Sequence, residues 1–225
     1  MSAMTDSGAG AGRRDETIQW HVATDIATPG WVEVPPPGDN SSQTWPDVAI
    51  AEVEEFWQGE TGPEIRAEIG RILAAAQQMR APQEALSLLY WPVQVPAAVG
   101  VHVRVLPTVS LARWTEADFD VIRYDGALIG SGAQCVQSAE VAMDGGNGSM
   151  PFVSASWVFN QGPDSVVVSV DPVPADWFMH MLGGLQSLLQ TLELRRPDGT
   201  LFVGEPFDGL ARTDIEEWAP LDDFA

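Results

Sequence analysis

The hydrophobic pattern of the chain changes its period twice. Apolar residues recur at helical spacing over residues 65–79 and again over 178–192, which predicts two amphipathic helices. Between them the period falls to two. Over residues 99–105 four valines share one face of a predicted strand, and His102 and Arg104 share the other. The middle of the chain is therefore expected to form strands and its flanks to form helices.

The remaining segments predict one further helix, a hairpin turn and several more strands. A Thr44-Trp45-Pro46-Asp47 sequence is typical of a helix start, and residues 144–148 are rich in the residues of hairpin turns. We expect strands over residues 18–23, 31–34, 85–93, 99–105, 119–124, 133–143, 150–160 and 166–171, with a short edge strand over 201–203. Arg195 and Arg196 are expected just past the last helix, where cations favour the helix dipole.

This order of elements predicts an α+β fold. An antiparallel sheet of about six or seven strands would be covered by helices on both faces, as an α-β-α sandwich. We expect a flexible leader over residues 1–16, a single domain over 17–203 and an acidic, aromatic tail over 204–225.

Composition excludes several classes of function. The chain has 225 residues, a formal net charge of −21 and no lysine, so its eleven basic residues are all arginine. P-loop enzymes, protein kinases and Schiff-base enzymes each need a lysine, so these classes are excluded. The negative charge also argues against direct binding of nucleic acid or of an anionic membrane, and favours another protein, of basic character, as partner.

Reactive and metal-binding residues are sparse. Cys135 is the only cysteine and lies in a predicted strand, so we interpret it as a small core residue. His21, His102 and His180 lack metal-ligand spacing, and we expect no metal and no other cofactor. With neither an export signal nor an apolar run of membrane length, the expected location is the cytoplasm.

Two groups of residues are candidates for binding. His102 and Arg104, on the polar face of their strand, form a candidate anion-binding strip; alternatively they are solvated, or lie under a helix paired with a glutamate. The tail alternates acids with apolar residues and is predicted to dock on a partner. Its candidate residues are Trp218, Leu221, Asp222, Asp223 and Phe224. The alternative is that the tail folds back on its own domain through Trp218.

The order of elements also resembles a known family. Pro29-Gly30-Trp31-Val32 follows the first predicted strand, an apolar stripe spans Ile65 to Met79, and the closing helix carries Leu182, Leu185, Ser187 and Leu188. Over residues 18–195 this is similar to the Mog/PsbP-like fold, which includes the DcrB-type bacterial proteins. The resemblance implies an α-β-α sandwich that binds other proteins, and it implies no catalytic or other site residues.

Charge and resemblance together predict a non-catalytic protein-interaction module, such as an adaptor, a secretion chaperone or an immunity-like inhibitor. One alternative is an acidic nucleic-acid mimic that inhibits a DNA-binding protein. Another is a small-ligand-binding protein or an enzyme with a pocket between sheet and helix, in which His102, Arg104 and one or two acids converge in an apolar cleft.

Overall fold

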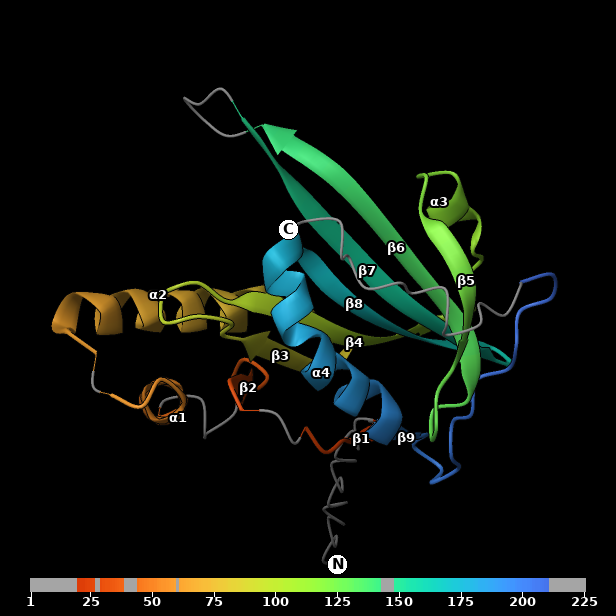
Figure 1. Cartoon of the computed structure of the whole chain (residues 1–225). Coiled ribbons are helices and arrows are strands. Elements are labelled where there is room, and N and C mark those ends of the chain that lie inside the picture. Colours follow the sequence, from red (N-terminus) through yellow and green to blue (C-terminus); the bar gives the residue numbers. More distant parts are fainter. Residues whose placement is uncertain (1–19, 27–28, 39–43, 60, 143–147, 211–225) are drawn as a thin grey trace, which may run out of the picture.

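The computed structural model describes residues 20–26, 29–38, 44–59, 61–142 and 148–210. At its centre is a seven-stranded antiparallel sheet in the order β2-β3-β4-β8-β7-β6-β5 (Figure 1). Its strands are β2 (Trp31–Glu33), β3 (Glu84–Tyr90), β4 (Val99–Pro107), β5 (Asp120–Asp125), β6 (Ser131–Ala142), β7 (Ser149–Gln161) and β8 (Asp164–Pro174). A separate antiparallel pair joins β1 (His21–Ala23) to β9 (Glu193–Arg195).

Helices cover both faces of the large sheet. The helix α4 (Ala175–Thr191) crosses one face, whereas α1 (Trp45–Phe56) and α2 (Pro63–Met79) pack against the other face beside β2 and β3 (Figure 1). The short α3 (Ala112–Thr115) lies on the same face as α1 and α2, over β6, β7 and β8. The α+β fold with helices on both faces of an antiparallel sheet is confirmed.

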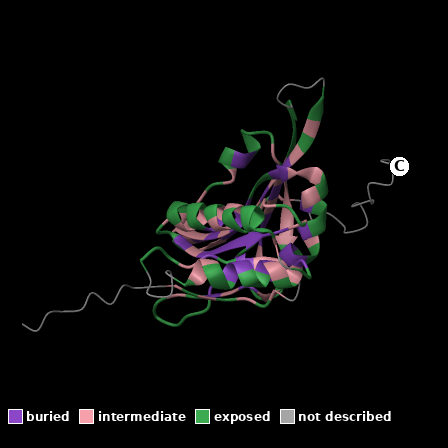
Figure 2. Cartoon of the chain, turned by 90° about the vertical axis from the view of Figure 1, so that its left-hand side faces the viewer, coloured by how far each residue is buried: buried purple, intermediate pink, exposed green. Residues whose placement is uncertain are grey.

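The core beneath α4 arises from two matching periods. Val101 and Val103 alternate on β4 and are fully buried, because every second strand residue faces α4. Met181, Leu185 and Leu188 lie on one side of α4 and pack into the same cluster. The valine alternation and the helical stripe of the sequence thus form the two sides of one core. Figure 2 shows the buried residues gathered in the sheet.

Gly184 sets how closely α4 approaches β2. A β-carbon at this position would overlap the indole ring of Trp31. The Trp31 ring packs in turn on Tyr90, with the two ring centroids 4.8 Å apart. The missing side chain therefore makes room for a pair of aromatic rings beneath the helix.

The opposite face carries two apolar clusters. Ile50, Ile69 and Trp91 belong to the cluster under α1 and α2, and Trp114 and Cys135 belong to the cluster under α3. Between them, strand pairing places four polar side chains in one row across β3, β4, β8 and β7. These are Ser87, His102, Ser169 and Ser156, which we call the polar strip.

Packing continues past the predicted end of the domain. The backbone N–H of Glu205 donates to Asn160 O at 2.9 Å, and Phe207 and Leu210 pack against the cluster under α3. Among the described residues, no helix combines the length and the apolar composition that crossing a membrane requires.

Some local expectations differ from the structure. Residues 201–203 form no strand, because their pairing is limited to an isolated bridge at Leu201. Arg195 and Arg196 do not cap α4, which ends at Thr191. Arg195 bonds Glu193 within β9, and Arg196 bonds Asp164 at 2.9 Å. The predicted apolar stripe of α2 also runs beyond its core, since Met79 is 75% exposed at the end of the helix.

Candidate functional site

A cavity of about 600 Å³ lies between α4 and the β5–β7 part of the sheet. The helix α4 packs over β7 and β8 (Figure 1), and side chains from Leu182 to Gln190 in its C-terminal half form one wall of the cavity. The cavity is lined by Ile122, Arg123, Tyr124, Asp125, Gly126, Ala127, Gln134, Trp157, Leu182, Leu185, Gln186, Leu189 and Gln190. This volume lies within the range of small-molecule sites, about 300–1,000 Å³.

The inner wall of the cavity is mostly apolar, and strand pairing fixes the order of its side chains. Ile122 pairs with Gln134 and Gln134 pairs with Trp157, so these three side chains form a row on the face beneath α4. Trp157, Leu185 and Leu189 are buried core residues. A ligand in this cavity would therefore rest on side chains that the core already holds in place.

The polar groups around the cavity carry little net charge. Gln186 and Gln190 are exposed on α4, and Gln134 faces them from β6. Arg123 is paired with Asp125, with Nη2 and Oδ1 3.0 Å apart. Such a lining of amides and an internally neutralised ion pair suits an uncharged molecule.

Tyr124 adds a protonated hydroxyl to this lining. Its ring packs edge-on against Phe159, with centroids 5.9 Å apart. Burial raises the pKa of the Tyr124 hydroxyl above its ordinary range, so this group stays neutral at physiological pH. It is able to donate a hydrogen bond to a carbonyl or hydroxyl oxygen.

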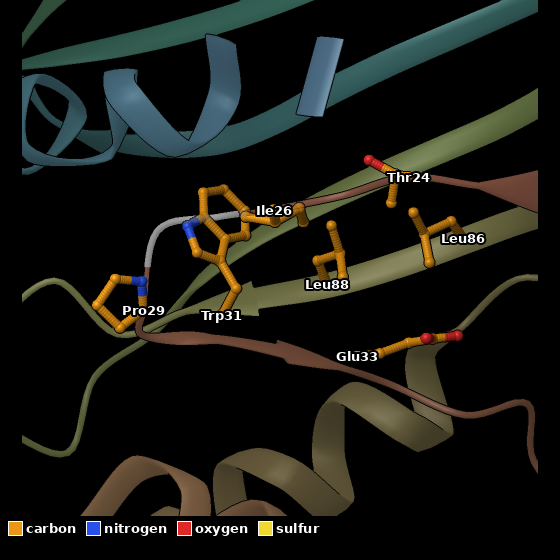
Figure 3. Close-up of a pocket in the computed structure, with 7 residues that line it drawn as sticks. All are labelled: Thr24, Ile26, Pro29, Trp31, Glu33, Leu86 and Leu88. Carbon is orange, nitrogen blue, oxygen red and sulfur yellow. The ribbon is translucent and has the colours of Figure 1, made fainter. Parts of the chain in front are cut away.

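A second, shallower pocket of about 430 Å³ opens between the segment before β2 and strand β3. It is lined by Thr24, Ile26, Pro29, Trp31, Glu33, Leu86 and Leu88 (Figure 3). Trp31, Ile26 and the two leucines lie together in the figure, and Glu33 stands apart from them. Trp31, Leu86 and Leu88 belong to the core under α4, so this pocket lies where the edge of that core meets solvent.

On the other face of the sheet, charged residues converge around His102 of the polar strip. Arg104 donates to Glu84 Oε1 from Nη2 at 3.0 Å and from Nε at 3.2 Å. His102 lies between two carboxylates: its Nδ1 is 3.3 Å from Glu84 Oε1, and its Nε2 is 3.5 Å from Asp171 Oδ1. The Glu84 side chain is only 2% exposed, so the sheet holds a buried carboxylate beside two cationic side chains.

Gly100 leaves space for this cluster. A β-carbon at Gly100 would overlap the Asp171 carboxylate and would lie 2.8 Å from His102 Nε2. Gly100 precedes His102 by two residues and so shares its face of β4. The glycine thus lets the His102 ring and the Asp171 carboxylate meet over the backbone.

The structure thus brings together His102 and Arg104, the two candidate anion-binding residues, and Glu84 supplies the carboxylate that both of them contact. An external anion would have to compete with this buried carboxylate. His102 and Arg104 lie on the face opposite the cavity, so the acids that join them do so away from the apolar cleft. The sequence placed the two cations on one face but did not point to Glu84 and Asp171. These acids reach His102 only because β3 and β8 lie on either side of β4.

Cys135, the tail residues and the histidines were the other candidates in the sequence. Cys135 is fully buried, and burial raises the pKa of its thiol to about 12, so it is protonated at neutral pH and packs as a core residue. The tail candidates Trp218, Leu221, Asp222, Asp223 and Phe224 lie outside the described residues. Within the described ranges, no three His, Cys, Asp or Glu side chains are grouped as metal ligands.

We expect the His102 cluster to make stability depend on pH. Burial opposes the charge on His102, but the hydrogen bond and the charge of Asp171 and the charge of Glu84 outweigh burial and Arg104. The pKa of His102 is therefore raised above its ordinary 6.5. A raised pKa contributes stability that is complete below pH 6.5 and is lost as pH rises through the folded-state pKa.

Urea unfolding between pH 5.5 and 8.5 (from about one unit below to about two units above the ordinary histidine pKa) measures this contribution. The free energy of unfolding of wild type relative to His102→Asn should fall as pH rises across this window. The matched control is His21→Asn, because His21 is exposed on β1, away from the cluster. A constant difference between wild type and His102→Asn would contradict the expected linkage.

Comparison of the chain with protein-family models, with curated protein sequences and with solved structures yields no match. The resemblance to the Mog/PsbP-like fold therefore stays a prediction, and the geometry of the chain itself carries the functional argument.

Proposed function

We propose that this chain is a non-catalytic binding protein that holds a small, uncharged, largely apolar molecule in the cavity beneath α4. The observation that carries the proposal is the cavity itself: about 600 Å³ between α4 and the sheet, with a buried apolar wall and amides at its rim. Ligand sites in proteins share this composition, in which apolar walls provide affinity and a few polar groups orient the ligand.

The lining also defines the chemistry of the ligand. Ile122, Leu182 and Leu189 offer contacts to an apolar body, and the side chains of Tyr124 and Gln134 offer hydrogen bonds. The one charged pair, Arg123 and Asp125, neutralises itself. A molecule with a ring or short chain and one or two carbonyl or hydroxyl oxygens matches these groups.

The groups around the cavity support binding rather than catalysis. The lining lacks the serine, cysteine and histidine of the common nucleophile–base pairs, and its carboxylate, Asp125, is engaged by Arg123 and by the Ser131 hydroxyl. The histidine–carboxylate cluster of the chain lies on the other face of the sheet. A bound molecule would therefore be held without contact to the residues best suited to acid–base chemistry.

The neutral fluorescent dye Nile red tests this proposal. We expect Ala127→Trp to weaken dye binding by at least about tenfold, because the indole would occupy the cavity and displace about 60 Å² of apolar contact. The matched control is Leu128→Trp. Leu128 is the next residue and is 47% exposed, but it does not line the cavity, so its replacement should leave the affinity nearly unchanged.

Dye titration of the three proteins gives the result, and thermal unfolding confirms that each variant folds. Equal affinities in Ala127→Trp and wild type would refute the cavity as the binding site. Equal weakening in both tryptophan variants would also refute it, because the effect would then not depend on the lining.

A further inference from the structure

The paired strands β6 and β7 extend beyond the neighbouring strand β5. Strand β5 pairs only with residues 131–136 of β6, whereas β6 continues to Ala142 and stays paired with β7 as far as Ser149. In Figure 1 this arm runs past the body of the molecule, away from α3 and β5. Among the described residues, no strand pairs with residues 137–142 on the β5 side, so the sheet has an open edge there.

Strand alternation identifies the free backbone groups of this edge. Gly126 N donates to Gly130 O at 2.8 Å, so Gly130 faces β5, and Ser131 N instead donates to Gly204 O. The pairing of β6 runs from Ser131 to Ala142 without a register shift, so even-numbered residues keep facing the β5 side. Ser138, Glu140 and Ala142 therefore present their N–H and C=O groups outward.

The two faces of the arm differ in chemistry. Ala139 and Val141 share one face, and they pair with Phe152 and Met150 of β7 to make it apolar. Val141 is 44% exposed, and the last described residues of the arm, 138–142 of β6 and 149–152 of β7, are exposed or intermediate (Figure 2). The other face carries Ser138 and Glu140 along the open edge, with their β7 partners Val153 and Pro151 one strand further in. A strand added to this edge would need apolar residues on one side and polar residues on the other.

Charge decides which polar residues fit. Asp120 pairs with Val136 and so lies on the same face as Glu140, and Glu116 and Asp118 are exposed at the adjoining corner after α3. Among the described residues, Arg113 is the cation on α3 at this corner, and it is stacked on the Trp114 ring with its guanidinium 3.9 Å from the ring centroid. A second copy of the chain would bring another net charge of −21 to this acidic corner, whereas a basic segment is attracted.

We infer that the open edge of β6 binds an extended segment of a partner protein as an added strand, and that this segment alternates apolar residues with lysine or arginine. Backbone hydrogen bonds to Ser138, Glu140 and Ala142 supply the pairing. The apolar residues of the segment lie beside Val141, and its basic residues lie beside Glu140 and Asp120. The protein-interaction role expected from the acidic composition thereby acquires a definite surface.

A capped octapeptide that alternates valine with lysine is the probe, with a valine–glutamate octapeptide as its counterpart. We expect the lysine peptide to bind the full chain and to protect the amide hydrogens of residues 138–142 from exchange. Ser138→Pro should weaken binding by about tenfold, since it removes one outward N–H and places a ring at the edge. Ser138→Thr keeps the N–H and should bind as wild type does.

The charge requirement has its own pair of variants. Asp120→Asn combined with Glu140→Gln should weaken the lysine peptide several-fold at low salt and reduce the salt dependence of its affinity. Arg113→Gln removes the nearby cation and should strengthen binding. Both test the charge without altering the backbone of β6, and thermal unfolding checks each protein.

Three results would overturn the inference. One is the absence of binding by the lysine peptide at millimolar concentration, and another is equal binding of the lysine and glutamate peptides. The third is a dimer in sedimentation velocity that Ser138→Pro abolishes, because the edge would then pair with a second copy rather than with a basic partner.

Discussion

Replacement of Leu188 with alanine is expected to lower the free energy of unfolding by about 2–5 kcal/mol. Leu188 is fully buried between α4 and the sheet. It does not line the cavity, so the change in stability does not include a lost ligand contact. Removal of its side chain deletes apolar contacts and leaves a void in a closely packed core. Urea unfolding followed by circular dichroism measures the change.

Met179→Ala is the matched control on the same helix. Met179 is 48% exposed, so its replacement should change the free energy of unfolding by less than about 0.5 kcal/mol. A small cost at both positions would mean that α4 is not part of the folded core. A large cost at both would mean that the exposed side of α4 is covered by something else.

A second large effect is expected from Gly130→Ala, with a cost of about 2–5 kcal/mol. Gly130 has φ +88°, a region that L side chains rarely adopt. A β-carbon there would also lie 2.5 Å from Gly204 O and 2.7 Å from Gly204 N, both backbone atoms that cannot rotate away. The bridge between Gly130 and Gly204 should break, and hydrogen exchange should accelerate over residues 201–205.

Gly162→Ala separates the two causes. Gly162 has φ +59°, and a β-carbon there would meet no atom within 4 Å. This variant therefore carries the conformational cost alone, about 1 kcal/mol. If both glycine variants lose the same stability, the contact with Gly204 contributes nothing to the fold.

Local patterns were sufficient to predict most of the elements. Alternating valines marked β4 because a half-buried strand repeats every two residues, and the spacing of leucines marked α4 because a helix repeats every 3.6. The helix α3 was missed, since its residues 112–115 span about one turn and show no period. Its Trp114 is nevertheless buried and covers one end of the sheet.

The sites depend on relations that no local pattern contains. The meeting of His102 with Glu84 and Asp171 requires β4 to lie between β3 and β8, and the cavity requires the C-terminal half of α4 to lie over β5–β7. The open edge of β6 could be anticipated in part from the lengths of the predicted strands. The predicted strand over 119–124 is about half as long as the one over 133–143, so part of the longer strand had to extend beyond its neighbour.

The small sheet of β1 and β9 has a consequence for the order of folding. His21 pairs with Arg195, and Thr24 Oγ1 lies 3.0 Å from Thr191 Oγ1, so residues from one end of the described chain join a helix formed near its other end. Closing so long a loop costs entropy before any contact offsets it. Among the described residues β9 is the only strand that pairs with β1. On the ribosome, we therefore expect β1 to pair only once β9 has been synthesised, when almost the whole domain is available to fold.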